Sequence, residues 1–134
     1  MSTSLLSRRL QLFPASAMVK GNGEGTQLTI ADCDLQQLAL DYGTPLYLYD
    51  ASTLQNAVQD YRQASKRFYP GPSEITYAAK AFLCTAMAQW VQRERLWLDC
   101  TGANELVIAA QAGLEPSNIV VHGVNKSLQD IQAA

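Results

Sequence analysis

Residues 75–100 read ITYAAKAFLCTAMAQWVQRERLWLDC, and this stretch decides the fold that the sequence predicts. It begins with a short apolar strand, Ile75 to Ala79, and ends with another, Leu96 to Cys100. Between them lies a predicted helix, Cys84 to Arg93. Its inner face carries Met87, Ala88 and Val91. Strands that alternate with helices pair in parallel through right-handed crossovers, so the stretch predicts a strand–helix–strand unit of an α/β protein.

The same rhythm extends toward the N-terminus. Pro45 to Tyr49 (PLYLY) is predicted to be a strand, and Asp50 or Ser52 caps the helix that follows. Apolar residues recur in this helix at spacings of three and four, which is the pattern of one buried face. They are Leu54, Ala57, Val58, Tyr61, Ala64 and Phe68. Residues 70–72 (PGP) end the helix, because proline cannot continue one.

Two more units are predicted toward the C-terminus. Thr101 caps a helix over Ala103 to Ala112, a glycine ends that helix, and Ile119 to His122 is a fourth strand. Ser127 with Asp130 resembles a capping box that opens a fourth helix, and the chain is expected to stop within it. Four strand–helix units make either a small open α/β sheet or half of a (β/α)8 barrel.

The segment before Gly43 is expected to differ from this rhythm. Residues 1–27 are predicted to be a loosely ordered leader, because two arginines interrupt the apolar patch that a secretory signal would keep whole. Within it, residues 21–25 (GNGEG) are predicted to be a flexible turn. Residues 28–30 (LTI) are a predicted strand, and Asp34 caps a helix that the glycine ends.

Length and charge exclude several classes of protein. The chain has 134 residues, with 10 Lys and Arg against 12 Asp and Glu, so its net charge is −2. It lacks the basic excess of a nucleic-acid groove, and its 48% apolar residues exclude a disordered chain. No apolar run approaches the roughly 20 residues that span a bilayer. A complete single-chain (β/α)8 barrel is also excluded, because it needs roughly 250 residues.

The cysteine and histidine counts point to a reducing compartment without a metal site. Cys33, Cys84 and Cys100 are an odd number without a C-x-x-C pair, so neither a disulfide framework nor a zinc site is predicted. The single histidine, His122, excludes a histidine-rich metal cluster. We therefore expect a cytoplasmic protein with no metal and with neither nucleic-acid nor membrane partners.

Lys80 is the first candidate for chemistry. It is the only charged residue between Ile75 and Gln92, and it follows a strand at the carboxyl end, where α/β folds place active-site groups. Apolar surroundings would favour its neutral amine, a nucleophile that can form a Schiff base. The alternative is a lysine with a buried stem whose amine reaches solvent. The residues alone leave both interpretations open.

Further candidates lie at or shortly after the ends of neighbouring strands. Asp99 ends the third strand and Glu105 opens the next helix, so the two carboxylates could orient a cationic group. Otherwise Glu105 only complements the helix dipole, and Asp99 serves the loop. His122 is either an acid or base or a packed strand-end histidine. Residues 125–127 (NKS) could bind an anion at a helix start or only cap it.

Four motifs in order carry a family resemblance. They are YGTPLY at 42–47, YAAKA at 77–81, the segment from Asp99 to Leu106, and HGVNKS at 122–127. In this order they resemble the N-terminal part of the fold-type-III pyridoxal-phosphate decarboxylases, the family that acts on ornithine, diaminopimelate and arginine. The stretch YPGPSEITYAAKA at 69–81 and HGVNKS are most similar to the diaminopimelate branch. The resemblance extends over residues 28–134.

This resemblance implies both fold and function. It implies an α/β fold that is a partial (β/α)8 TIM barrel of alanine-racemase type, with about the first four strand–helix units of a barrel that binds pyridoxal 5'-phosphate. Full-length members add a β-domain and act as homodimers on a small amino acid. The implied reaction is decarboxylation of meso-diaminopimelate to L-lysine and CO2, in lysine biosynthesis. Lys80 matches the catalytic lysine that holds the cofactor, while Asp99, Glu105 and His122 match residues near it.

The sequence differs from the family pattern at two positions, and the resemblance extends over only the first part of the family's sequence. Gly102 stands where the family usually has Ser, and Trp97 where a small residue is common. The family's phosphate loop, ring-binding groups and substrate residues fall beyond Ala134, in the second half of the barrel and the β-domain. We therefore expect an N-terminal fragment that is inactive alone. Two alternatives are a non-catalytic remnant or interaction module of this fold, and another pyridoxal-phosphate-dependent amino-acid decarboxylase or racemase.

Overall fold

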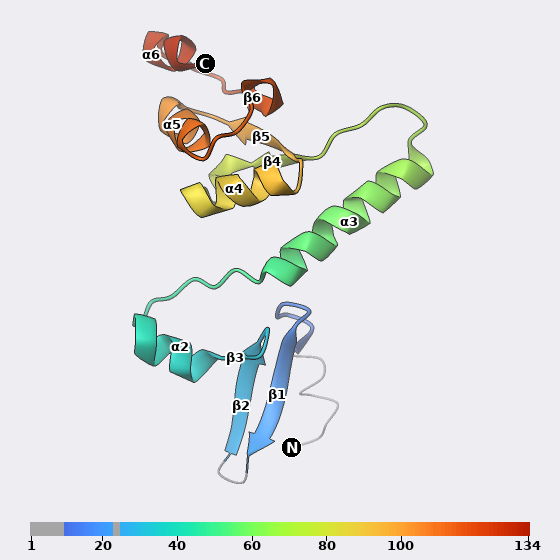
Figure 1. Cartoon of the computed structure of the whole chain (residues 1–134), viewed down its shortest axis with the longest axis vertical. Coiled ribbons are helices and arrows are strands. Elements are labelled where there is room, and N and C mark those ends of the chain that lie inside the picture. Colours follow the sequence, from blue (N-terminus) through green and yellow to red (C-terminus); the bar gives the residue numbers. More distant parts are fainter. Residues whose placement is uncertain (1–9, 23–24) are drawn as a thin grey trace. The chain divides into compact units, whose positions relative to one another are not determined.

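The computed structural model describes residues 10–22 and 25–134 (Figure 1). The chain divides into two compact units, Met1–Tyr61 and Arg62–Ala134, and each is considered by itself. No helix in the described ranges is long and apolar enough to cross a membrane.

The first unit contains an antiparallel sheet followed by a short helix. Its elements are β1 (Ala17–Asn22), β2 (Gly25–Ile30), β3 (Cys33–Asp34) and α2 (Leu35–Tyr42). The Asp34 carboxylate accepts a hydrogen bond of 2.8 Å from the amide of Gln36, and Gly43 ends the helix at φ 80°. The predicted strand at 28–30 and the predicted helix with both of its boundaries are therefore confirmed.

The predicted leader is more ordered than the sequence indicates. Residues 17–22 and 25–27, expected to be loose, lie in β1 and β2, with Ala17 opposite Ile30 in the register. Of the predicted turn at 21–25, Gly21 and Gly25 are strand residues. Glycines near a hairpin resemble a loop in a local window, whereas antiparallel pairing supplies the order from a neighbouring strand. Residues 1–9 and 23–24 lie outside the described residues.

The predicted strand at Pro45–Tyr49 is wrong. No described strand pairs with this segment, and its apolar side chains are exposed, Tyr47 at 86%. A strand needs a neighbour to satisfy its backbone groups, and β-propensity alone does not provide one. The bond between Thr44 and Pro45 is cis. The described chain after Gly43 therefore has three strands rather than the four predicted.

Helix α3 (Ala51–Phe68) has the predicted boundaries but not the predicted burial. Asp50 rather than Ser52 caps it, since the Asp50 carboxylate accepts a hydrogen bond of 3.1 Å from the amide of Ser52. Of the predicted apolar face only Val58 is buried, while Tyr61 and Phe68 are exposed. Periodicity indicates which face of a helix could be covered, but it cannot supply the covering surface.

The second unit is a parallel α/β sheet in the order β4-β5-β6 (Figure 1). Its elements are β4 (Thr76–Ala78), the 3-10 turn η1 (Ala79–Ala81), α4 (Thr85–Arg93), β5 (Trp97–Cys100), α5 (Ala103–Gln111), the 3-10 turn η2 (Pro116–Asn118), β6 (Ile119–Val121) and α6 (Leu128–Ala133). These match the predicted strands and helices to within a few residues.

The core of this unit surrounds the middle strand. Leu98 and Cys100 of β5 are fully buried, and α4 and α5 pack against β5 and against each other. Helix α4 buries its predicted inner face, Met87, Ala88 and Val91. Because β5 is hydrogen-bonded on both sides, residues near its carboxyl end have fixed positions relative to both neighbours. Across the described ranges the parallel sheet is open and not a closed barrel.

Candidate functional site

Three of the predicted site residues come together at the carboxyl edge of the parallel sheet. Lys80 follows β4, Asp99 lies in β5, and His122 follows β6. In the register Ala78 lies opposite Asp99 and Asp99 opposite Val120. The amide of His122 continues the ladder by donating to the carbonyl of Cys100 at 2.9 Å. Parallel pairing thus gathers residues that are far apart in sequence at one edge.

Lys80 lies on an anchored turn with its own side chain exposed. The neighbouring Ala79 is buried, and the Tyr77 hydroxyl donates to the Phe82 carbonyl at 2.7 Å across the turn. The Tyr77 ring meets Trp90 edge to face, with ring centroids 6.2 Å apart. Lys80 makes no hydrogen bond or ion pair to a residue that the structure describes. The predicted apolar surroundings are therefore wrong for this structure, in which the amine is accessible.

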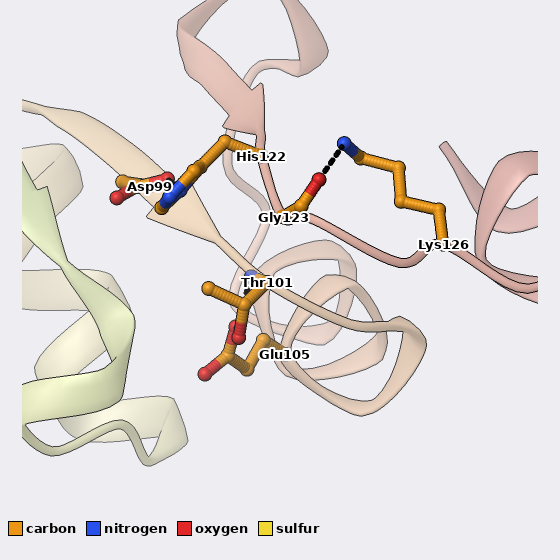
Figure 2. A network of polar contacts seen from close by, with 6 residues as sticks. All are labelled: Asp99, Thr101, Glu105, His122, Gly123 and Lys126. Atoms are coloured by element: carbon orange, nitrogen blue, oxygen red, sulfur yellow. Dashed lines mark hydrogen bonds and ion pairs between the residues drawn. The ribbon is translucent and has the colours of Figure 1, made fainter.

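Asp99 and His122 form a hydrogen-bonded pair across β5 and β6. The His122 Nδ1 atom is 2.7 Å from Asp99 Oδ1. The Asp99 side chain is 20% exposed and the His122 side chain 56% exposed. Figure 2 shows the imidazole turned toward the carboxylate of the neighbouring strand. The sequence predicted both residues at this rim but did not predict that they contact each other.

Glu105 does not join Asp99 in the carboxylate pair that the sequence suggested. Its Oε2 atom instead accepts hydrogen bonds from the amide and the hydroxyl of Thr101, the latter at 3.1 Å, as Figure 2 shows. The predicted Thr101 cap is also wrong, since the N-cap residue of α5 is Gly102, which has no side chain to cap with. Glu105 therefore shapes the loop between β5 and α5.

Asp130 performs the capping that Thr101 was expected to perform. Its Oδ1 atom accepts from the amide of Ala103 at 2.9 Å, and its Oδ2 atom accepts from the Ser127 hydroxyl at 2.7 Å. The predicted capping box of α6 is confirmed, and the same carboxylate also closes the start of α5. Hydrogen bonds from the Ser127 side chain, and then from the Ser127 and Ala103 amides, lower the pKa of Asp130. No local sequence signal links residues 27 positions apart.

Residues 125–127 were predicted either to bind an anion or only to cap a helix, and in the structure they cap a helix. Lys126 Nζ donates to the Gly123 carbonyl at 3.1 Å, as Figure 2 shows, and Ser127 caps α6. A shallow hollow of about 430 Å³ lies beside this loop, lined by residues 101–105 with Gln129 and Asp130. Within the described ranges no cluster of three or more His, Cys, Asp or Glu side chains is arranged to hold a metal ion.

The three cysteines are free thiols in different environments. Cys33 is exposed, whereas Cys100 lies in the core beneath the site. Burial raises the pKa of the Cys100 thiol to about 11, and the nearby Glu105 and Asp99 carboxylates add to the effect. A thiol held in its protonated form is a poor nucleophile, so Cys100 is a packing residue.

This chain is similar in sequence to a known protein family and to enzymes of one name. A family described as "Pyridoxal-dependent decarboxylase, pyridoxal binding domain" matches residues 54–134. The chain is 37% identical over 131 residues to diaminopimelate decarboxylase of Synechocystis sp., a match that covers 92% of this chain and 27% of the relative. It is 42% identical over 106 residues to the Mycobacterium tuberculosis enzyme of the same name, covering 78% and 23%.

A solved structure has the same fold. Diaminopimelate decarboxylase from M. jannaschii in complex with L-lysine matches at a TM-score of 0.75 and 25% identity, covering 89% of this chain and 28% of that one. The predicted α/β class and its relation to a pyridoxal-binding barrel are confirmed. The chain spans about a quarter of the length of the relatives it matches.

Proposed function

Since the chain belongs to the pyridoxal-dependent decarboxylase family, with its pyridoxal-binding domain matched over residues 54–134, we propose that it supplies the cofactor-anchoring part of a diaminopimelate decarboxylase. The proposed reaction is decarboxylation of meso-diaminopimelate to L-lysine and CO2. Identities of 37% and 42% to enzymes of that name support this choice within the family. The structural observation that carries it is an accessible lysine at the same sheet edge as a carboxylate–imidazole pair.

The residues present suit pyridoxal 5'-phosphate. The Lys80 amine is exposed and unpaired among the described residues, as attachment to an aldehyde requires. When bound, the cofactor supplies an electron sink for the electrons that remain when the carboxylate leaves as CO2. We assign Lys80 to attachment, and Asp99 and His122 to the polar wall beside it. Glu105 contributes through Thr101 by holding the β5–α5 loop.

The 134-residue chain by itself is proposed to bind the cofactor but not to turn over substrate. About three quarters of each matched relative lies outside the match. The homodimer predicted from the family resemblance stays a prediction. A cytoplasmic location is proposed on the three free thiols, which suit a reducing compartment.

A chimera tests the proposed function directly. Residues 54–134 would replace the matching segment of the Synechocystis enzyme, and CO2 release and L-lysine formation from meso-diaminopimelate would be measured. We expect activity that depends on pyridoxal phosphate and is lost in Lys80→Ala but kept in Lys66→Ala, a matched control because Lys66 is exposed on α3. A folded chimera that binds no cofactor would support the non-catalytic alternative instead, and activity that survives Lys80→Ala would contradict the role assigned to Lys80.

A further inference from the structure

Asp99 occupies the most constrained position at the site. It lies in the middle strand, in register with Ala78 on one side and Val120 on the other. Its side chain is only 20% exposed, whereas that of His122 is 56% exposed. The carboxylate is therefore the fixed member of the pair, and the more exposed imidazole is oriented by it.

The hydrogen bond between them determines which imidazole nitrogen carries the proton. An ionised carboxylate has no hydrogen to donate, so the Nδ1 atom 2.7 Å from Asp99 must be the donor. A neutral imidazole has one N–H, and placing it on Nδ1 leaves Nε2 with a free lone pair. The pair thus selects one of the two neutral tautomers of His122.

Two of the other charged groups near the pair have partners of their own. Glu105 accepts from Thr101, and Lys126 donates to the Gly123 carbonyl. Lys80, on the far side of β5, makes no hydrogen bond to a described residue. The structure gives no hydrogen bond from His122 Nε2 to a residue in the described ranges, so this lone pair is available at the edge.

We propose that Asp99 is a positioning residue that holds His122 as the Nδ1–H tautomer, so that Nε2 accepts a hydrogen bond from an N–H or O–H group of the ligand bound at Lys80. The identity of that ligand as a pyridoxal compound rests on the proposed function. The tautomer follows from the geometry of this chain alone.

The test uses the fact that His122 is the only histidine in the chain. Nuclear magnetic resonance of the ¹⁵N-labelled chain would assign the two ring nitrogens and show which of them carries the proton. The spectra would be recorded about two pH units above the ordinary histidine pKa of ~6.5, where the ring is neutral. We expect a predominant Nδ1–H form in the natural sequence and in Asp60→Ala, a control that removes an exposed carboxylate from α3. In Asp99→Ala this preference should disappear.

Addition of pyridoxal 5'-phosphate provides the second measurement. We expect the Nε2 resonance to move in the natural chain and to stay in place in Lys80→Ala. A predominant Nε2–H form in the natural chain would overturn the inference without any variant, as would an unchanged tautomer in a folded Asp99→Ala. An unmoved Nε2 resonance while Lys80 carries the ligand would also overturn it. If no ligand attaches to Lys80, the proposed function fails, and the tautomer alone decides the role of Asp99.

Discussion

Asp50 provides a prediction whose magnitude can be worked out from its contacts. Its carboxylate is buried at the start of α3 and accepts hydrogen bonds from the Ser16 hydroxyl at 2.8 Å, the Ser52 amide at 3.1 Å and hydroxyl at 2.8 Å, and the Thr53 hydroxyl at 2.5 Å. These donors, with Thr53 first, hold the pKa of Asp50 at about 2, below the ordinary 3.8, against the opposing effect of burial.

The sign and size of the effect on stability follow from this pKa. The folded pKa lies below the unfolded one, so the stabilisation is complete above about pH 4 and is lost as the pH falls toward 2. A displacement of slightly under two pKa units, at about 1.4 kcal/mol each, corresponds to ~2.5 kcal/mol. The ionised carboxylate stabilises the folded state, in which Asp50 bonds both Ser16, before β1, and Thr53, in the first turn of α3.

The assay is urea unfolding of the natural chain and of Asp50→Asn between pH 7 and pH 2.5, followed by helical circular dichroism. At neutral pH the variant should be less stable by about 1–2 kcal/mol, and the difference should shrink as the pH falls below about 4. Asp60→Asn, an exposed position on the same helix, should show no such trend. A difference that stays constant across this pH range, or is absent at pH 7, would refute the reasoning.

Three further predictions concern residues of the second unit, two of which are compared with a residue of the first unit. Leu98→Ala should lower the free energy of unfolding by about 2–5 kcal/mol, whereas the same change at the exposed Leu40 should cost less than about 0.5 kcal/mol, as measured by urea unfolding. In thiol labelling at neutral pH, Cys33 should react quickly and Cys100 only on unfolding. Gly102→Ser should stabilise the chain by a few tenths of a kcal/mol, as measured by thermal unfolding. A Cβ at this position would meet only a carboxylate oxygen at 3.8 Å, and serine caps a helix slightly better than glycine.

The parallel sheet could be predicted because its signals are local. The inner face of α4 is a short periodic pattern, and Gly113 at φ 79° marks the end of α5 in the sequence as well as in the structure. The order of the strands then places Lys80, Asp99 and His122 at one edge without any knowledge of their contacts. These parts of the site follow from topology alone.

The parts that could not be predicted depend on partners distant in sequence. The segment Pro45–Tyr49 has strand-like residues but no described strand to pair with. Asp130 was recognised as a cap for its own helix, yet its bond to Ala103 crosses to another one. Glu105 accepts hydrogen bonds from the amide and hydroxyl of Thr101 and does not pair with Asp99. Local sequence patterns predicted the order of the strands, but they do not predict which partner a polar side chain contacts.

The central claim is that Lys80 anchors a pyridoxal cofactor, and borohydride trapping tests it most directly. The chain has four lysines, of which Lys20 pairs with Asp32, Lys126 binds a carbonyl, and Lys66 is an exposed internal control. After incubation with pyridoxal 5'-phosphate, reduction and digestion, mass spectrometry would locate the label. We predict that the label lies predominantly on Lys80 and disappears in Lys80→Ala. Equal labelling of Lys66 and Lys80, or undiminished labelling of the variant, would contradict the account.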